Sequence, residues 1–171
     1  MNMSAPLTNI RSFVSYQFSS LRMRALRDLV LAKLTGKSTK LPIISAQVRR
    51  EQPNRILLGL KDIPVEQIGG TINRDGDFDH KFRPLKKHLL NRWINIYMLL
   101  ERDSWPPILV HKIGEKYYVE DGHHRVSVAR SIGMEFIEAK VWEYQAPQNQ
   151  TRACLRVKCR ERNTSKVYAA R

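Results

Sequence analysis

Long apolar stretches are absent from this sequence, which argues against a membrane-spanning protein. No segment reaches the roughly 18 consecutive apolar residues that a transmembrane helix requires. The opening residues, MNMSAPLTNIRSF, also lack the basic and apolar regions of a secretory signal peptide. We therefore expect a cytoplasmic protein without a membrane partner. Hydrophobic residues still make up 42% of the 171 residues, which is enough for the core of one domain.

Cysteine is also scarce, with Cys154 and Cys159 as the only two. In a cytoplasmic protein we expect both to be reduced thiols. Their C-x4-C spacing without a second pair is a weak metal-binding pattern. Asp75, Asp77 and Asp79 have the spacing of a calcium-binding loop, but the later glutamate of such a loop is missing. The sequence therefore predicts no metal site.

Acidic residues are missing mainly from the two ends of the chain. The net charge is +14, with ten Lys/Arg against two Asp/Glu in residues 1–60 and seven against one in residues 144–171. Residues 61–143 contain thirteen of each and are neutral. Basic flanks attract polyanions over long distances and gain from counterion release. We expect nucleic acid as the partner, DNA in the first place, while a basic surface without a dedicated partner stays an alternative.

Residues 8–35 show the periodicity of a helix, and Gly36 is expected to end it. One face is formed by apolar residues three and four positions apart, namely Phe18, Leu21, Ala25, Leu29 and Ala32. The arginines of this segment lie largely off that face. We expect residues 1–56 to form a basic helical arm that packs on its own domain or on a second subunit, so a homodimer is one expected assembly.

Residues 144–171 form a basic C-terminal tail. In its segment CLRVKCR, apolar residues alternate with basic ones, which is typical of a strand, although a disordered tail fits equally well. The side chains expected to contact nucleic acid come from both flanks: Arg22, Arg24, Arg27, Arg49, Arg50, Arg156, Lys158 and Arg160.

Residues 57–143 are predicted to form the ordered domain between the two flanks. The expected strands are 55–60, 63–68, 108–112, 117–120 and 136–142, and the expected helices are 84–100, starting at Pro84, and 123–132. Gly69 and Gly70 break the pattern and open a polar loop. The resulting order of strand, loop, helix, hairpin, helix and strand predicts a small mixed-sheet domain of the α/β (α+β) class.

The turn at residues 120–125, EDGHHR, lies between a predicted strand and a predicted helix. The first amides of a helix lack partners within it and lie at the positive end of its dipole, which favours an anion. Gly122 has no side chain to keep a phosphate away from the backbone. His123 and His124 add ring donors, and Arg125 adds a planar fork suited to phosphate oxygens. The turn therefore predicts a phosphate site.

Each of these residues also has a structural role open to it. Asp121 is more often a helix cap than a catalytic base or a metal ligand. One of the two histidines can simply pack or bond to a carbonyl group, and Arg125 can form a structural salt bridge. The functional interpretation is favoured because all of these groups lie on one turn.

Residues 117–133, YYVEDGHHRVSVARSIG, resemble the signature of ParB N-terminal domains and sulfiredoxins. The corresponding turn reads G-E-R-R in ParB proteins and G-C-H-R in sulfiredoxins. Gly122 and Arg125 match both families, and His124 matches the sulfiredoxin histidine. The upstream segment IPVEQI, followed by Arg74, resembles the first strand and the arginine of the same fold. The resemblance covers about half of the chain. It implies a ParB/sulfiredoxin-like fold whose phosphate- or nucleotide-binding site is formed by residues 122–125 of the turn and by Arg74 from the polar loop.

Departures from these families limit what the resemblance implies about activity. Position 123 is histidine, where a sulfiredoxin has its catalytic cysteine and a ParB protein its glutamate. The chain also lacks room for the helix-turn-helix domain of partition ParB proteins. The closest overall likeness is to small bacterial ParB-like proteins with a basic helical arm ahead of the domain, which implies a fold without a reaction.

The D-G-H-H-R form of the turn also resembles the free serine kinase branch of this superfamily. That likeness implies a nucleotide-dependent phosphotransferase with an acidic catalytic residue near Glu66. Two functions are therefore expected. The first is a phosphate- or nucleotide-binding protein whose basic flanks contact nucleic acid, and the flanks favour it. The second is a phosphotransferase or nuclease that uses Mg²⁺ and takes its carboxylates from Glu66, Glu120 and Asp121.

Overall fold

The computed structural model describes residues 7–36, 38–44, 55–72, 76–100 and 105–144. Within these ranges it contains three α-helices, two short 3₁₀ helices and a five-stranded sheet. The helices are α1 (Leu7–Thr35), η1 (Val65–Gln67), η2 (Lys87–Leu89), α3 (Leu90–Leu100) and α4 (His123–Ser131). The strands are β1 (Arg55–Pro64), β2 (Ile68–Thr71), β3 (Ile108–Ile113), β4 (Lys116–Asp121) and β5 (Phe136–Tyr144).

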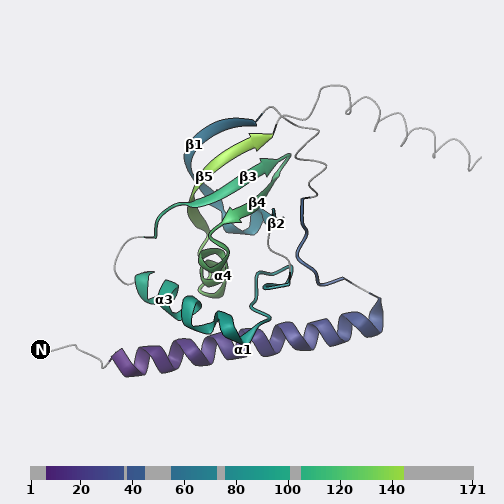
Figure 1. The fold of residues 1–171 in the computed structure, drawn as a ribbon, viewed down its shortest axis with the longest axis vertical. Helices are drawn as coiled ribbons and strands as arrows, with labels where there is room; N and C mark the ends of the chain where they lie inside the picture. Colours follow the sequence, from purple (N-terminus) through teal and green to yellow (C-terminus); the bar gives the residue numbers. More distant parts are fainter. Residues whose placement is uncertain (1–6, 37, 45–54, 73–75, 101–104, 145–171) are drawn as a thin grey trace, which may run out of the picture.

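The five strands form one mixed sheet in the order β1-β5-β3-β4-β2. β5 pairs antiparallel with β1 and parallel with β3, while β4 pairs antiparallel with β3 and parallel with β2. In Figure 1 the sheet lies at the top, α4 lies beneath it, and α3 and α1 follow below. The predicted mixed-sheet α/β class with an N-terminal helix is confirmed.

The predicted break at Gly69 and Gly70 is wrong, because both residues lie in β2. A Cβ atom at Gly70 would collide with the carbonyl oxygen of Pro42 and lie 2.9 Å from the ring of Tyr118. The same Pro42 oxygen accepts a hydrogen bond from the Thr71 amide at 2.9 Å. Glycine is therefore needed where the chain around residue 42 and strand β4 both approach β2 closely.

The predicted helix start at Pro84 is also wrong. The chain is still extended there, because Pro84 forms a β-bridge with Phe78 and the Leu85 amide donates to the Asp77 carbonyl oxygen at 2.9 Å. The helical conformation begins only at η2, which leads directly into α3. Tertiary pairing with the preceding loop outweighs the local preference of proline for a first helical turn.

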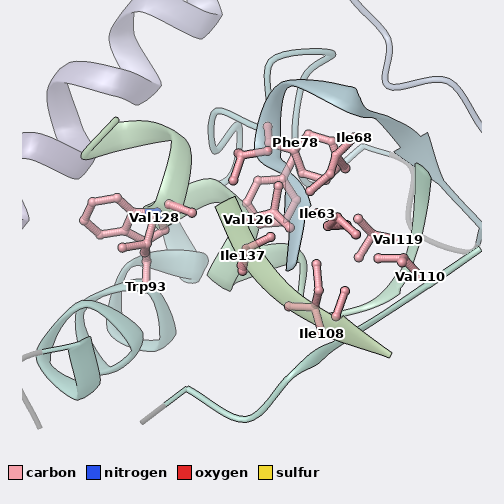
Figure 2. Packing of buried hydrophobic residues seen from close by; sticks show 14 of the residues in the cluster. Ile63, Ile68, Phe78, Trp93, Ile108, Val110, Val119, Val126, Val128 and Ile137 are labelled. Carbon is pink, nitrogen blue, oxygen red and sulfur yellow. The ribbon is translucent and has the colours of Figure 1, made fainter. Parts of the chain in front are cut away.

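The hydrophobic core lies between the sheet and α4 and extends to α3. Its strand residues include Ile63, Ile68, Ile108, Val110, Val119, Ile137, Ala139 and Val141. Val126, Val128 and Ala129 of α4 pack against them. Figure 2 shows Trp93 at one end of this cluster, beside Val128. The Trp93 indole donates from Nε1 to Ser127 Oγ at 3.0 Å, so burial of the ring leaves its polar atom satisfied.

Helix α1 packs on the domain through the face that its periodicity predicts. Val14 and Phe18 belong to the core, and the Phe18 ring meets the Trp93 ring edge-on with 5.8 Å between centroids. Arg22 Nε donates to the Leu85 carbonyl oxygen at 3.0 Å. The segment predicted as an arm therefore contributes, through α1, to the same core as the sheet.

The loop between β2 and η2 is organised by one buried carboxylate. Asp79 Oδ1 accepts hydrogen bonds from the amides of Lys81 at 3.0 Å and Arg83 at 2.8 Å. Asp79 Oδ2 accepts one from Arg83 Nε at 2.7 Å. The same guanidinium reaches Asp28 on α1 at 2.9 Å, and this hydrogen bond is the main cause of a lowered pKa of Asp28. The network ties the loop to α1.

Candidate functional site

The strand-to-helix turn forms as predicted, since β4 ends at Asp121 and α4 begins at His123. Gly122, rather than Asp121, occupies the N-cap position of α4. The Gly122 carbonyl accepts the first helical bond, from the Val126 amide, at 3.0 Å. The positive end of the α4 dipole therefore points out of this turn.

Gly122 is required by packing. Its φ of 103° lies in the left-handed region, which side chains other than glycine rarely adopt. A Cβ atom there would collide with the Ile108 side chain, whose own Cβ would be 2.8 Å away. The Cβ direction at Gly122 is therefore filled by Ile108 of β3, so packing by itself requires glycine at this position.

Arg125 is largely buried, with 8% of its surface exposed. Its Nη1 donates to the carbonyl oxygens of Pro106 and, at 3.0 Å, Pro107, and its Nη2 donates to Asp121 Oδ2 at 2.7 Å. Burial is the main cause of a lowered pKa of Arg125, and the nearby Asp121 opposes it. The guanidinium thus connects the segment before β3 to the turn. This is the structural salt bridge that the sequence analysis gave as the alternative role of Arg125.

The two histidines of the turn are buried among aromatic rings. His123 Nε2 lies 2.7 Å from Thr71 Oγ1, and its ring stacks on Phe78 and Phe82 with centroids 6.4 and 6.5 Å away. The His124 ring meets Phe78 edge-on at 5.3 Å. These contacts join α4 to β2 and to the loop that follows it.

A cavity of about 230 Å³ opens at the start of α4. It is lined by all five residues of the turn, 121–125, by Pro106, and by Arg92, Ile96 and Leu99 of α3. Arg92 is exposed and lies close enough for its charge to lower the pKa of Arg125 further. We call this space the turn cavity; its lining combines a helix N-terminus with two arginines, Arg92 and Arg125.

Arg92 was missed in the sequence. It precedes the buried Trp93 on α3, and nothing in its local pattern distinguishes it from an ordinary exposed helix residue. Only the packing of α3 beside α4 brings it to the turn, so the sequence carries no local signal for it.

The three predicted carboxylates are not brought together. Glu66 lines a separate cavity of about 840 Å³ with Arg130 and Ser131. Glu120 Oε2 lies 2.5 Å from Nε2 of the buried His111. Asp121 is the one carboxylate lining the turn cavity within the described part of the chain, and it is paired with Arg125.

The larger cavity is bounded at one end of α4 by a half-buried arginine, Arg130. Arg130 Nη2 donates to the carbonyl oxygens of Val65 at 3.2 Å and Ile68 at 2.6 Å, and its guanidinium stacks over Phe82. Burial lowers the pKa of Arg130. Arg130 therefore holds η1 against α4.

The basic residues predicted to contact nucleic acid divide into three groups. Arg24 and Arg27 are exposed on α1, whereas Arg22 is half-buried and bonded to Leu85. The others lie outside the described residues, as does Arg74 of the predicted phosphate site: Arg49, Arg50, Arg156, Lys158 and Arg160. Cys154, Cys159 and Asp75 also lie outside them.

Two further searches concern the described residues only. None of their helices is long and apolar enough to span a bilayer. Their His, Cys, Asp and Glu side chains form no group of three that could hold a metal ion.

No protein-family model, curated protein or solved structure matches this chain, so a functional assignment depends on its own residues and on the geometry of the turn cavity.

Proposed function

We propose that this protein binds phosphate groups of a nucleotide or a nucleic acid in the turn cavity, and that its basic flanks contact nucleic acid. One observation carries the proposal: the N-terminal turn of α4, Arg92 and Arg125 all line one cavity. A helix N-terminus offers unpaired amides to a phosphate, and arginine offers it a planar set of donors. The resemblance of this turn to the ParB and sulfiredoxin signatures agrees with the proposal.

The size of the turn cavity indicates which part of a ligand it encloses. At about 230 Å³ it is smaller than the roughly 300–1,000 Å³ of pockets that enclose a drug-sized molecule. It therefore suits a phosphate group, with the nucleoside lying outside. Arg92 is the cation most available to that phosphate, because Arg125 already donates to three protein oxygens.

The phosphotransferase alternative has less support. Such a reaction needs carboxylates, usually with Mg²⁺, beside the transferred phosphate. Glu66 lines the other cavity and Glu120 bonds to His111, so neither faces the proposed phosphate position. A binding protein is the function that these contacts favour.

Replacing Arg92 with alanine is expected to weaken the binding of ATP about tenfold, because a charge-assisted contact contributes about 1.5 kcal/mol. The melting temperature should stay within a degree or two, since the side chain is exposed. Isothermal titration calorimetry with ATP and with pyrophosphate, with and without Mg²⁺, measures the affinity.

Lys87→Ala is the matched control, because Lys87 is an exposed cation on η2 that does not line the turn cavity. Arg125→Ala should instead lower the melting temperature, since it leaves two carbonyl groups and Asp121 without their donor. A stable Arg92→Ala protein that binds ATP and pyrophosphate like the wild type defeats the phosphate proposal.

The nucleic-acid part of the proposal is tested on α1 without removing the helix, because Val14 and Phe18 belong to the core. Replacing Arg24 with glutamine is expected to reduce the slope of log K against log salt by up to about 1 for duplex DNA, the share of one lost phosphate contact. Fluorescence anisotropy of a labelled mixed-sequence duplex over a salt series gives this slope. An unchanged slope contradicts a role for Arg24.

A further inference from the structure

Helix α1 has a second apolar face in addition to the one it buries. Its exposed large hydrophobic side chains are Phe13, Tyr16, Met23, Val30, Leu31 and Leu34, which are between 51% and 79% exposed. A surface helix usually has one apolar stripe toward the core and a polar opposite face. Contiguous apolar surface of this kind commonly marks an interaction site.

Five of these residues follow a coiled-coil spacing. Phe13, Tyr16, Met23, Val30 and Leu34 occupy alternating three- and four-residue steps, in which Ser20 and Arg27 fill the two remaining positions. We call these seven positions the outer stripe. They extend over about 33 Å of helix, at 1.5 Å per residue. In Figure 1 α1 runs along the lower edge of the molecule, and the described strands and helices lie above it.

We propose that the outer stripe is the contact surface for α1 of a second copy of this chain, with the two helices antiparallel. In this orientation Phe13 faces Leu34 of the other copy, and Tyr16 faces Val30. Met23 lies at the twofold axis. This inference does not depend on the proposed phosphate-binding function.

The two polar residues of the outer stripe, Ser20 and Arg27, favour the antiparallel orientation of the two helices. Antiparallel helices place Arg27 of one copy opposite Ser20 of the other, where a small hydroxyl leaves room for the guanidinium. Parallel helices would place Arg27 against Arg27, and like charges in a seam are unfavourable. The one acidic residue of α1, Asp28, is bonded to Arg83 of the domain and is not available to neutralise them.

The exposed apolar area is sufficient for a dimer. The five large side chains of the outer stripe, together with the neighbouring Leu31, offer on the order of 700 Å² per copy, against roughly 800 Å² per partner in a stable interface. A nucleic acid would leave this apolar area uncovered. A membrane surface would have to accept Arg27 in the middle of the stripe, so a second copy is the occupant that the residues favour.

The test is sedimentation velocity of the full-length chain over a range of concentrations, without nucleotide or nucleic acid. The wild type is expected to dimerise. Tyr16→Lys and Val30→Glu should each raise the dimer dissociation constant at least about tenfold, because each alters two symmetry-related contacts. The double variant Tyr16→Lys/Val30→Glu should recover the dimer, since antiparallel helices place each lysine opposite a glutamate. Parallel helices would oppose like charges and show no recovery.

Leu60→Glu is the matched control, because Leu60 is equally exposed and apolar but lies on β1. Thermal melts verify that each variant is folded. Raising the salt concentration should strengthen the dimer, since antiparallel pairing brings the two Arg24 side chains near the twofold axis and salt screens their repulsion. A dimer held together by a bound polyanion would instead become weaker as the salt concentration rises. A wild type that stays monomeric, a dimer that ignores Val30→Glu, or a monomer that binds phosphatidylserine vesicles through the stripe each overturns the proposal.

Discussion

Replacing Asp79 with alanine is expected to lower the free energy of unfolding by about 3–5 kcal/mol, because it removes one partner of a buried ion pair. Asp79 is 1% exposed and accepts hydrogen bonds from two amides and from Arg83 Nε. Its loss leaves the Arg83 guanidinium, which is mostly buried, with Asp28 as its remaining carboxylate. Urea denaturation followed by circular dichroism measures the change.

Asp77→Ala provides the comparison within the same loop. Asp77 pairs with Lys86 at 2.8 Å, but the Lys86 side chain is 49% exposed, so the substitution should cost no more than about 1 kcal/mol. Similar losses in the two variants would contradict the assignment of Asp79 as the organising residue.

Replacing Gly122 with alanine is expected to lower the free energy of unfolding by about 2–5 kcal/mol. Two costs add here: about 1–2 kcal/mol for a side chain at positive φ, and about 1–3 kcal/mol for overpacking. The overpacking arises because the new methyl group would lie only 2.8 Å from Ile108 Cβ and closer still to its Cγ2. Urea denaturation, with the slope m compared as well as the midpoint, tests whether the folded state itself has changed.

Gly114→Ala isolates the backbone cost. Gly114 also has a positive φ, of 59°, but an added Cβ meets no atom within 4 Å. Its loss of stability should therefore be limited to about 1–2 kcal/mol. If Gly122→Ala costs no more than Gly114→Ala, the close approach of β3 to the turn is not what requires glycine at position 122.

Local signals predicted the central part of the fold well. The double proline before β3, the glycine of the hairpin and the glycine before α4 give the chain few alternatives, so the strand-turn-helix at 108–131 forms within a residue or two of its predicted bounds. The buried face of α1 was predicted because a helical period repeats over several turns. The predictions at Gly70 and Pro84 were wrong because pairing with distant segments decided both positions.

The candidate site was only partly predictable, for a related reason. The sequence shows which hydrogen-bond donors and acceptors a residue has, but not which partners they bind. The guanidinium of Arg125 can donate to carbonyl oxygens as well as to phosphate, and in the structure it donates to carbonyl oxygens. The position of Arg92 at the turn, and the separation of Glu66 from it, follow from how α3 and η1 pack on α4. Those placements leave no pattern in the local sequence, so the sequence predicted the turn but not the residues from other elements that lie beside it.

The pairing of β1 with β5 shifts register between Leu57 and Gly59, and this irregularity has a consequence for aggregation. β1 is the outer strand of the sheet beyond β5, and Ile56, Leu57 and Leu60 are exposed on it. An apolar edge of ten residues would offer a template to the strands of neighbouring molecules. The bulge between Leu57 and Gly59 interrupts the ladder, and Lys61 and Asp62 add charge beyond it. A growing fibril would therefore find no uninterrupted row of amides and carbonyls along β1, which directs self-association away from the sheet.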